Sequence, residues 1–130
     1  MFLTTPKLSF EDHRGFIKDI LFNESLDAVT IIESKKGVVR GNHFHKETVQ
    51  WVYLHAGCLK SLTQFPDGPV EKRILLPGQL LRTDPMECHA LEALEDSLFY
   101  VLTRGPRGGM DYEKDTYRLD VPLRDPDNHV

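Results

Sequence analysis

The sequence predicts a single all-β domain, folded either as a sandwich or as a closed roll. Short runs rich in β-branched and aromatic residues succeed one another along the chain, and turn-forming residues separate them. No long window shows the 3.6-residue apolar period of an amphipathic helix. The chain has 130 residues, which is enough to bury most of its apolar surface in one domain without disulfides or a structural metal. Many evenly spaced strands in so short a chain favour a sandwich or a closed roll.

Each predicted strand is short and is bounded by turn signals. In chain order, we expect strands at Phe16–Leu21, Ala28–Glu33, Val38–His45, Val49–Leu54, Leu59–Phe65, Val70–Leu76, Leu80–Arg82, Cys88–Leu94 and Leu98–Thr103. The connections at 35–37, 66–69, 77–78, 84–85 and 105–109 are rich in Gly, Pro and Asp, and Pro66-Asp67-Gly68 predicts a hairpin. We expect one turn of helix at 23–27, a strand core over 28–104 and a tail over 105–130. The end of that tail, 123–130, should be loose or packed against a partner.

Alternation along the fourth predicted strand indicates which side chains face inward. Gln50, Val52 and Leu54 share one face, which suits a barrel interior with one polar residue at its mouth. The opposite face carries Trp51 and Tyr53 and is too apolar for open solvent. We therefore expect the sheet of a partner subunit to cover it, which predicts a homodimer.

Composition and charge disfavour several classes of protein. The net charge is −4 and no basic cluster occurs, so we do not expect nucleic-acid binding. The isolated Cys58 and Cys88 form no metal or redox motif, and we expect reduced thiols in a cytoplasmic protein. The first residues lack the apolar run of a signal peptide, and no stretch reaches the ~18 apolar residues of a membrane span.

A cluster of spaced polar residues carries the functional signal. The segment follows the pattern Gly37-x5-His43-x-His45-x4-Gln50-x6-Gly57. Alternate side chains of a strand share a face, so His43 and His45 point the same way. A histidine pair needs only one or two further donors to become a metal site or an acid/base pair. His89 follows a turn-rich stretch, and strand alternation places it on the same interior side as Gln50.

These two stretches resemble the two motifs of the cupin superfamily. The first motif has Glu where this chain has Gln50, and the second resembles the stretch Asp84-Pro85-Met86-Glu87-Cys88-His89, with Asp84 and Met86 in place of Pro and Gly. The resemblance implies a jelly-roll β-barrel, or double-stranded β-helix, with its site inside the barrel mouth.

A narrower resemblance is to the cupin sugar 3,4-ketoisomerases of dTDP-4-keto-6-deoxyglucose and to the related dTDP-4-dehydrorhamnose 3,5-epimerases. It lies in Asp12-His13-Arg14-Gly15, in Arg40-Gly41-Asn42-His43-Phe44-His45-Lys46 and in the stretch 112–117. It implies that His43 and His45 are an acid/base pair acting on a nucleotide-linked keto sugar of polysaccharide biosynthesis, without a metal. Arg40 and Tyr117 would bind the substrate, with Arg40 at the sugar or its phosphate. Tyr112 or Tyr117 could also supply a phenolic acid if the C-terminal segment folds back over the barrel mouth.

The third histidine resembles the last ligand of metal-binding cupins and keeps a second hypothesis open. His43, His45, Gln50 and His89 could together hold a divalent Zn, Mn, Fe or Ni ion, and no organic cofactor is expected. All four ligands would be neutral, which favours Lewis-acid chemistry over that of a 2-His-1-carboxylate iron oxygenase. The alternatives to the sugar isomerase are thus a metal-dependent cupin, either a Lewis-acid isomerase or a dioxygenase, and a sugar-binding cupin without turnover.

Overall fold

The structure is a computed structural model that describes residues 1–106 and 113–128. Its strands are β1 (Phe2–Thr4), β2 (Phe10–Asp12), β3 (Gly15–Ile17), β4 (Ala28–Ser34), β5 (Val39–Phe44), β6 (Val49–Ala56), β7 (Leu59–Gln64), β8 (Glu71–Leu75), β9 (Leu80–Thr83), β10 (Cys88–Ala93), β11 (Ser97–Arg104) and β12 (Tyr117–Arg118). Within the described ranges, no helix is long and apolar enough to cross a membrane. The helical turn predicted at 23–27 is wrong, because this stretch is irregular and Asn23 adopts a positive φ of 58°.

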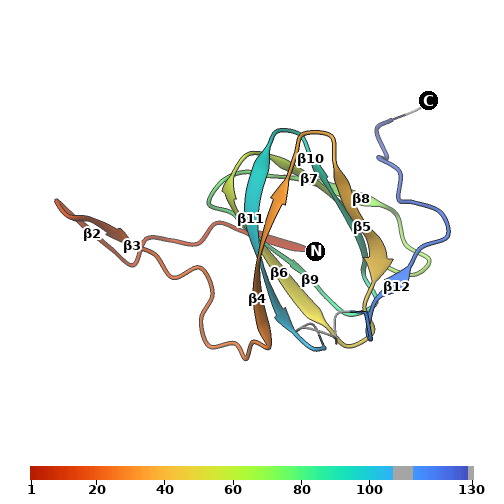
Figure 1. Ribbon diagram of the computed structural model, residues 1–130, viewed down its shortest axis with the longest axis horizontal. Coiled ribbons are helices and arrows are strands. Elements are labelled where there is room, and N and C mark those ends of the chain that lie inside the picture. The colour runs from red at the N-terminus through yellow and green to blue at the C-terminus, as the bar shows by residue number, and fades with distance from the viewer. Residues whose placement is uncertain (107–112, 129–130) are drawn as a thin grey trace.

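Two antiparallel five-stranded sheets face each other around a common interior (Figure 1). Their strand orders are β1-β9-β6-β11-β4 and β12-β5-β10-β7-β8. Successive strands often lie in different sheets, as β4 and β5 do, so the chain winds back and forth across the barrel. The predicted all-β jelly-roll barrel is confirmed.

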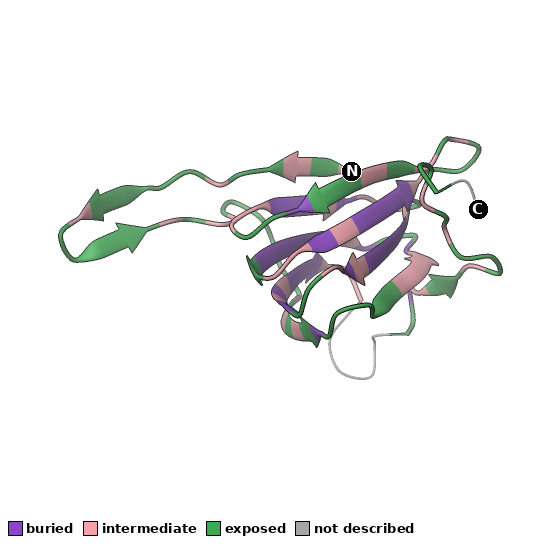
Figure 2. Cartoon of the chain, turned by 90° about the horizontal axis from the view of Figure 1, so that it is seen from above, coloured by how far each residue is buried: buried purple, intermediate pink, exposed green. Residues whose placement is uncertain are grey.

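The hydrophobic core fills the space between the two sheets. Its buried members come from β6 to β11 and are Val52, Leu54, Leu59, Leu75, Leu81, Leu91, Ala93, Phe99 and Val101. The buried stretches run along the strands of the barrel (Figure 2). Val52 and Leu54 lie in this core while Trp51 and Tyr53 do not, so the alternation predicted for β6 is confirmed. Complete burial of a leucine contributes roughly 1.5–3 kcal/mol.

The outer face of β6 is covered by the chain's own N-terminal segment. Trp51 and Tyr53 are buried in a second cluster, against which Ile20 and Leu21 pack. The expectation that a partner's sheet covers these two aromatic residues is therefore wrong. The predicted strand at 16–21 ends at Ile17, and the chain beyond it lies over the sheet instead.

Two other segments differ from expectation. Strands β2 and β3 form a separate two-stranded sheet that projects from the barrel (Figures 1 and 2). The tail is bound to the protein's own barrel at Asp125, because Lys60 and Lys72 bind the Asp125 carboxylate at 3.0 and 3.2 Å. The pKa of Asp125 is lowered to about 2. The largest cause is the hydrogen bond from the Asp127 backbone N–H, and the hydrogen bonds from Lys60 and Lys72 add to it. The predicted loop at 105–109 is described only as far as Pro106.

Candidate functional site

The histidines come together because β5 and β10 are paired strands. His43 lies opposite His89 in the register, and a bulge follows between His89 and Ala90. Gly41 makes this close pairing possible. Its φ is +96°, and a Cβ at this position would lie 2.7 Å from the backbone oxygen of His89. Only glycine combines that backbone conformation with the close approach of the neighbouring strand.

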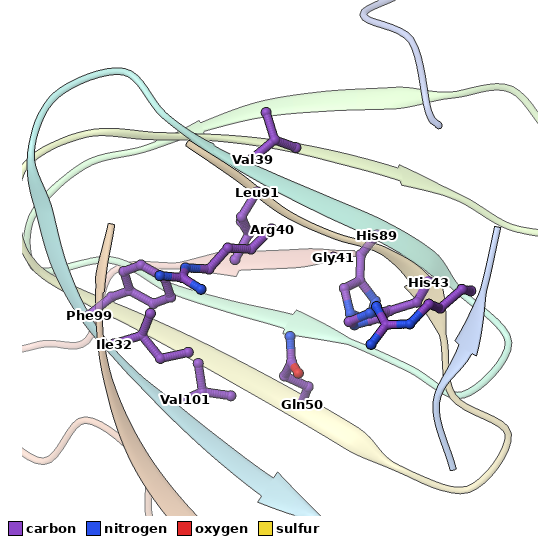
Figure 3. Close-up of a pocket in the computed structure, with 11 residues that line it drawn as sticks. Ile32, Val39, Arg40, Gly41, His43, Gln50, His89, Leu91, Phe99 and Val101 are labelled. Atoms are coloured by element: carbon purple, nitrogen blue, oxygen red, sulfur yellow. The ribbon is translucent and has the colours of Figure 1, made fainter. Parts of the chain in front are cut away.

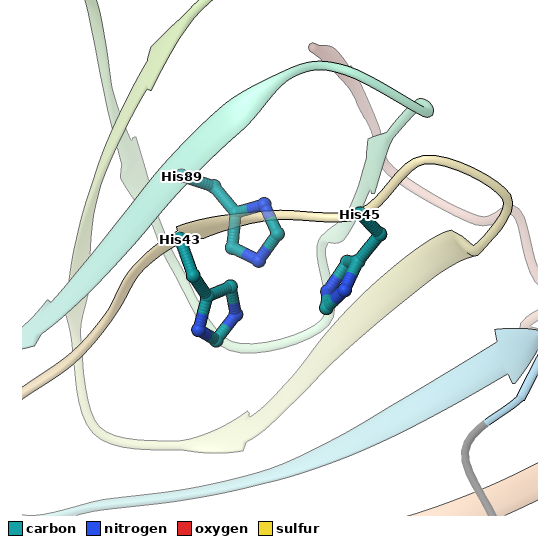
Figure 4. A group of neighbouring side chains, drawn as sticks. All are labelled: His43, His45 and His89. Carbon is teal, nitrogen blue, oxygen red and sulfur yellow. The ribbon is translucent and has the colours of Figure 1, made fainter. Parts of the chain in front are cut away.

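Three imidazole rings converge at one end of the barrel (Figure 4). The ring centroids are 4.9 Å apart for His43 and His45, 4.6 Å for His43 and His89, and 5.1 Å for His45 and His89. One potential ligand nitrogen from each ring lies within 4.8 Å of the others. His45 and His89 are only 8% and 4% exposed. The predicted convergence of histidines from two separate β segments is confirmed.

Backbone carbonyls determine which ring nitrogen carries the proton in two of the histidines. His45 Nδ1 lies 2.7 Å from the Asp115 carbonyl oxygen, and His89 Nδ1 lies 3.2 Å from that of Glu87. A carbonyl only accepts, so each Nδ1 carries the proton and donates it. In the neutral ring, Nε2 then bears the lone pair.

His89 is held in its neutral form. Its burial, reinforced by the neighbouring His43 and His45, lowers its pKa to about 3. Its Nε2 is buried and makes no hydrogen bond to any residue that the structure describes. A buried polar atom of this kind needs a partner such as a bound ion, a water molecule or a substrate group.

A cavity of about 340 Å³ opens beside the histidines (Figure 3). Its lining is Ile32, Val39, Arg40, Gly41, His43, Gln50, His89, Leu91, Phe99, Val101 and Arg118. Gln50 projects from β6, across the barrel from His43 and His89 on the opposite sheet (Figure 3). The four residues predicted as metal ligands therefore lie at the same end of the barrel, His45 through its contacts with the other two rings.

Two arginines supply positive charge to the cavity. Arg40 is tethered to β4, because its Nε donates to Ser34 Oγ at 2.7 Å and its terminal nitrogen to the Glu33 carbonyl at 2.9 Å. Arg118 lies opposite His43 in the β12–β5 pairing and forms an ion pair of 3.1 Å with Glu113. Positive charge next to an apolar wall suits a ligand with an anionic part.

Tyr117, which was predicted to contact the substrate, does not line the cavity. Tyr117 stacks on Phe44 at 5.3 Å between ring centroids, with Lys46 Nζ 4.4 Å from the tyrosine ring centroid. Neighbouring residues of a strand face opposite ways, so Arg118 lines the cavity and Tyr117 does not. Tyr112, the other tyrosine considered, lies outside the described residues.

Sequence reasoning also missed Asp115, a buried residue of the tail. Its carboxylate accepts hydrogen bonds from the backbone N–H groups of Lys46, Glu47 and Thr48, each at 2.9 Å. Burial alone would raise the pKa of Asp115, but these hydrogen bonds outweigh burial and lower it. No local pattern could have revealed this role, since the partners are almost seventy residues away in the sequence.

The chemistry of the donors fits both a divalent ion and proton transfer. The backbone carbonyls of Asp115 and Glu87 orient His45 and His89 through Nδ1, an arrangement typical of metal-binding histidines. The amide oxygen of Gln50 could complete a neutral ligand set. Without an ion, the same imidazoles could act as acid and base on a carbonyl compound.

Comparison with known proteins gives results at the level of structure. No protein-family model and no curated protein matches the sequence. Among solved structures, dTDP-4-dehydrorhamnose 3,5-epimerase from Sulfolobus tokodaii superimposes with a TM-score of 0.74 at 22% identity, covering 94% of this chain and 81% of the epimerase. A sugar 3,4-ketoisomerase from Thermoanaerobacterium thermosaccharolyticum, solved with TDP, gives a TM-score of 0.75 at 21% identity over 92% of this chain and 88% of its own.

A 3,4-ketoisomerase from Helicobacter canadensis is similar to the same degree, with a TM-score of 0.76 at 17% identity over 90% of this chain and 89% of its own. These likenesses establish the fold, which is that of the cupins. The predicted resemblance to the dTDP-sugar epimerases and ketoisomerases is confirmed as a structural likeness.

Proposed function

We propose that this protein is an isomerase or epimerase that acts on a nucleotide-linked keto sugar. The observation that carries the proposal is the convergence of His43, His45 and His89 beside a cavity that also holds Arg40. Moving a ketone or inverting its neighbouring carbon requires a base to remove the α-proton and an acid to protonate the enolate oxygen. Neighbouring imidazoles can supply both roles near neutral pH. The likeness to solved sugar epimerases and ketoisomerases supports the same chemistry.

The charge of the cavity supports an anionic substrate. Arg40 is anchored through neutral groups, Ser34 Oγ and the Glu33 carbonyl, and forms no ion pair within the described part of the chain. Its charge therefore remains available to a phosphate or another anion. We propose that Arg40 contacts the diphosphate of the substrate and that Arg118 takes the place expected for Tyr117.

Solvent exchange tests the proposal directly. The protein is incubated with dTDP-4-keto-6-deoxyglucose in D₂O, and deuterium at the carbons next to the ketone is followed by NMR. We expect exchange with the native protein, and its loss in His43→Asn and His45→Asn. His55→Asn is the matched control, because His55 lies exposed on β6 and does not line the cavity. Absence of exchange with the native protein, with and without added divalent metal, would leave only a sugar-binding role.

A divalent metal is a second candidate, favoured by the buried Nε2 of His89. His43, His45, His89 and Gln50 would hold the ion, which when bound would polarise a substrate carbonyl as a Lewis acid. The chain's own residues then orient the substrate: Arg40 binds its anionic part, and the apolar wall of Leu91 limits water at the reacting carbon.

Elemental analysis of untagged protein, purified without chelator, distinguishes the two candidates. A metal protein should contain about one Zn, Mn, Fe or Ni per chain, and His89→Ala should release it while His55→Ala retains it. Protein that contains no metal and takes up none on addition would exclude this candidate and leave proton transfer alone.

We also propose that the protein is a homodimer, assembled through the projecting hairpin. Phe16 and Ile17 of this hairpin are each 60% exposed, and an isolated two-stranded hairpin is marginally stable in water. On β4 of the barrel, Val29 and Ile31 are 65% and 59% exposed. Two copies could cover both apolar surfaces reciprocally, as an isologous contact requires.

Light scattering coupled to gel filtration tests this assembly. We expect a mass of two chains for the native protein and of one chain for Phe16→Glu. Phe65→Glu is the matched control, because Phe65 is also exposed but lies in the loop that follows β7, a strand of the opposite sheet. A native protein that runs as a monomer at high concentration would contradict the proposal.

A further inference from the structure

Asp115 connects the C-terminal segment to the turn that carries the histidine pair. It is only 3% exposed, and its carboxylate accepts four hydrogen bonds. The donors are the backbone N–H groups of Lys46, Glu47 and Thr48 and the hydroxyl of Thr48, each at 2.9 Å. These residues form the turn between β5, which presents His43, and β6, which presents Gln50. A carboxylate from a distant segment of the chain thus satisfies three successive backbone N–H groups of the turn.

The same residue also holds the imidazole of His45. Its backbone carbonyl accepts the Nδ1–H of that ring at 2.7 Å, a short hydrogen bond between buried groups. The side chain of Asp115 therefore holds the turn, and its main chain determines which nitrogen of His45 carries the proton. A displacement of Asp115 would affect the backbone of the turn and the ring together.

We infer that Asp115 is a positioning residue, which fixes the tautomer and orientation of His45 so that its Nε2 is presented to the other two histidines. It does not line the cavity, and among the proposed ligands it contacts His45 alone, at Nδ1, so it acts only through His45 and the turn. Its effect on turnover rests on the proposed function, whereas its effect on the His45 tautomer does not.

The packing around the Asp115 carboxylate leaves it little freedom to move. A Cβ at Gly105 would lie 2.5 Å from Thr48 Oγ1, so the chain after β11 packs closely against the hydroxyl that Asp115 binds. On the other side, β12 begins two residues after Asp115 and pairs with β5. The carboxylate is thus held between two anchored segments.

Graded variants isolate the contribution of the side chain, because all of them keep the backbone carbonyl. Asp115→Ala removes all four hydrogen bonds. Asp115→Asn retains one acceptor oxygen but turns an NH₂ group towards a donor. Thr48→Val removes only the hydroxyl bond. Asp125→Asn is the control, since Asp125 is another tail carboxylate whose partners, Lys60 and Lys72, lie away from the histidines.

Nitrogen-15 NMR of histidine-labelled full-length protein reports the tautomer. In the native protein we expect His45 with its proton on Nδ1. In Asp115→Ala we expect a mixture of the two tautomers, with smaller mixtures in Asp115→Asn and Thr48→Val and none in Asp125→Asn. Because small misplacements of a reacting group cost up to ~10²-fold, the exchange rate constant of Asp115→Ala should fall roughly 10- to 100-fold, with KM little changed.

Two outcomes would overturn the inference. The first is native His45 with its proton on Nε2, which is measurable whether or not any variant folds. The second is a folded Asp115→Ala protein, with native circular dichroism, whose His45 tautomer is unchanged. If the tautomer behaves as expected but native protein shows no solvent exchange, the proposed function fails and the positioning role stands.

Discussion

The two ends of this barrel are made from the same strands but have opposite character. Along β6, Leu54 is completely buried in the apolar core, while Gln50 on the same face borders the cavity. Along β10, Ala93 belongs to the core and His89 to the histidine cluster. One end of each strand supplies apolar burial and the other collects polar groups that the fold itself does not require. Stability and chemistry should therefore respond to different substitutions within a single strand.

The largest expected effect is on turnover, at the end of the barrel that carries the histidines and the cavity, which we call the open end. His43→Asn should lower the solvent-exchange rate by roughly 10²–10⁴-fold, the usual contribution of general acid–base catalysis. The free energy of unfolding should change by less than ~1 kcal/mol, because His43 is only partly buried beside a cavity. Exchange kinetics and urea unfolding on the same preparation check both numbers. A large loss of stability would show that the open end also holds the barrel together.

The reverse result is expected at the other end of the barrel, where Leu54 lies in the apolar core. Leu54→Ala should lower the free energy of unfolding by about 2–5 kcal/mol, through lost burial and the cavity left behind. The exchange rate per folded molecule should stay within about twofold of native, since Leu54 does not line the cavity. Urea titration gives the stability, and kinetics at low temperature give the rate. A parallel fall in both quantities would mean that the two ends are mechanically coupled.

A smaller effect is expected where the strands of the site approach each other. Gly41→Ala would bring a Cβ to 2.7 Å from the His89 oxygen, so β5 and β10 must separate. We expect a loss of about 1–3 kcal/mol together with slower exchange. Gly37→Ala is the matched control, because Gly37 also has a positive φ, +89°, but no atom lies within 4 Å of its added Cβ. Equal effects on exchange in the two variants would refute the role of close approach.

The smallest effect concerns the ion pairs of the tail residue Asp125 with Lys60 and Lys72, which belong to neither end of the barrel. The pKa of Asp125 falls from 3.8 to about 2 on folding, so the unfolded chain binds this proton more readily. The stability that Asp125 contributes is present above about pH 4 and is lost as the pH falls towards 2. Asp125→Asn should therefore be slightly less stable than native protein at pH 7, and the difference should shrink on acidification. Urea midpoints measured across this range test the sign, and a difference that grows in acid would contradict it.

Much of the barrel could be predicted because its signals are local. Strict alternation in β6 separated Val52 and Leu54 from Trp51 and Tyr53 without knowledge of any partner strand. The spacing of His43 and His45 likewise determined their common face. What covers the aromatic face could not be predicted, since Ile20 and Leu21 reach it only by a turn of the chain beyond the projecting hairpin.

The remainder of the site depends on distant contacts. The resemblance pointed to Tyr117, but β12 has only two residues, too few for alternation in the sequence to show that Arg118 and not Tyr117 faces the cavity. Asp115 has no motif at all, because its meaning lies in a turn far away in the sequence. The helical turn expected at 23–27 failed for a related reason, because Glu24 binds Arg104 and the Asp27 N–H donates to the Thr103 carbonyl, and both partners lie far away in the sequence on β11.

The pairing of His43 with His89 makes the site sensitive to chain length. Inserting one residue between Gly41 and His43 would rotate His43 to the outer surface, because neighbouring residues of a strand alternate. Inserting two residues would restore its orientation but move it by roughly 6–7 Å along the strand. An insertion or deletion in β5 should therefore disrupt the histidine cluster more severely than most exchanges of one side chain for another.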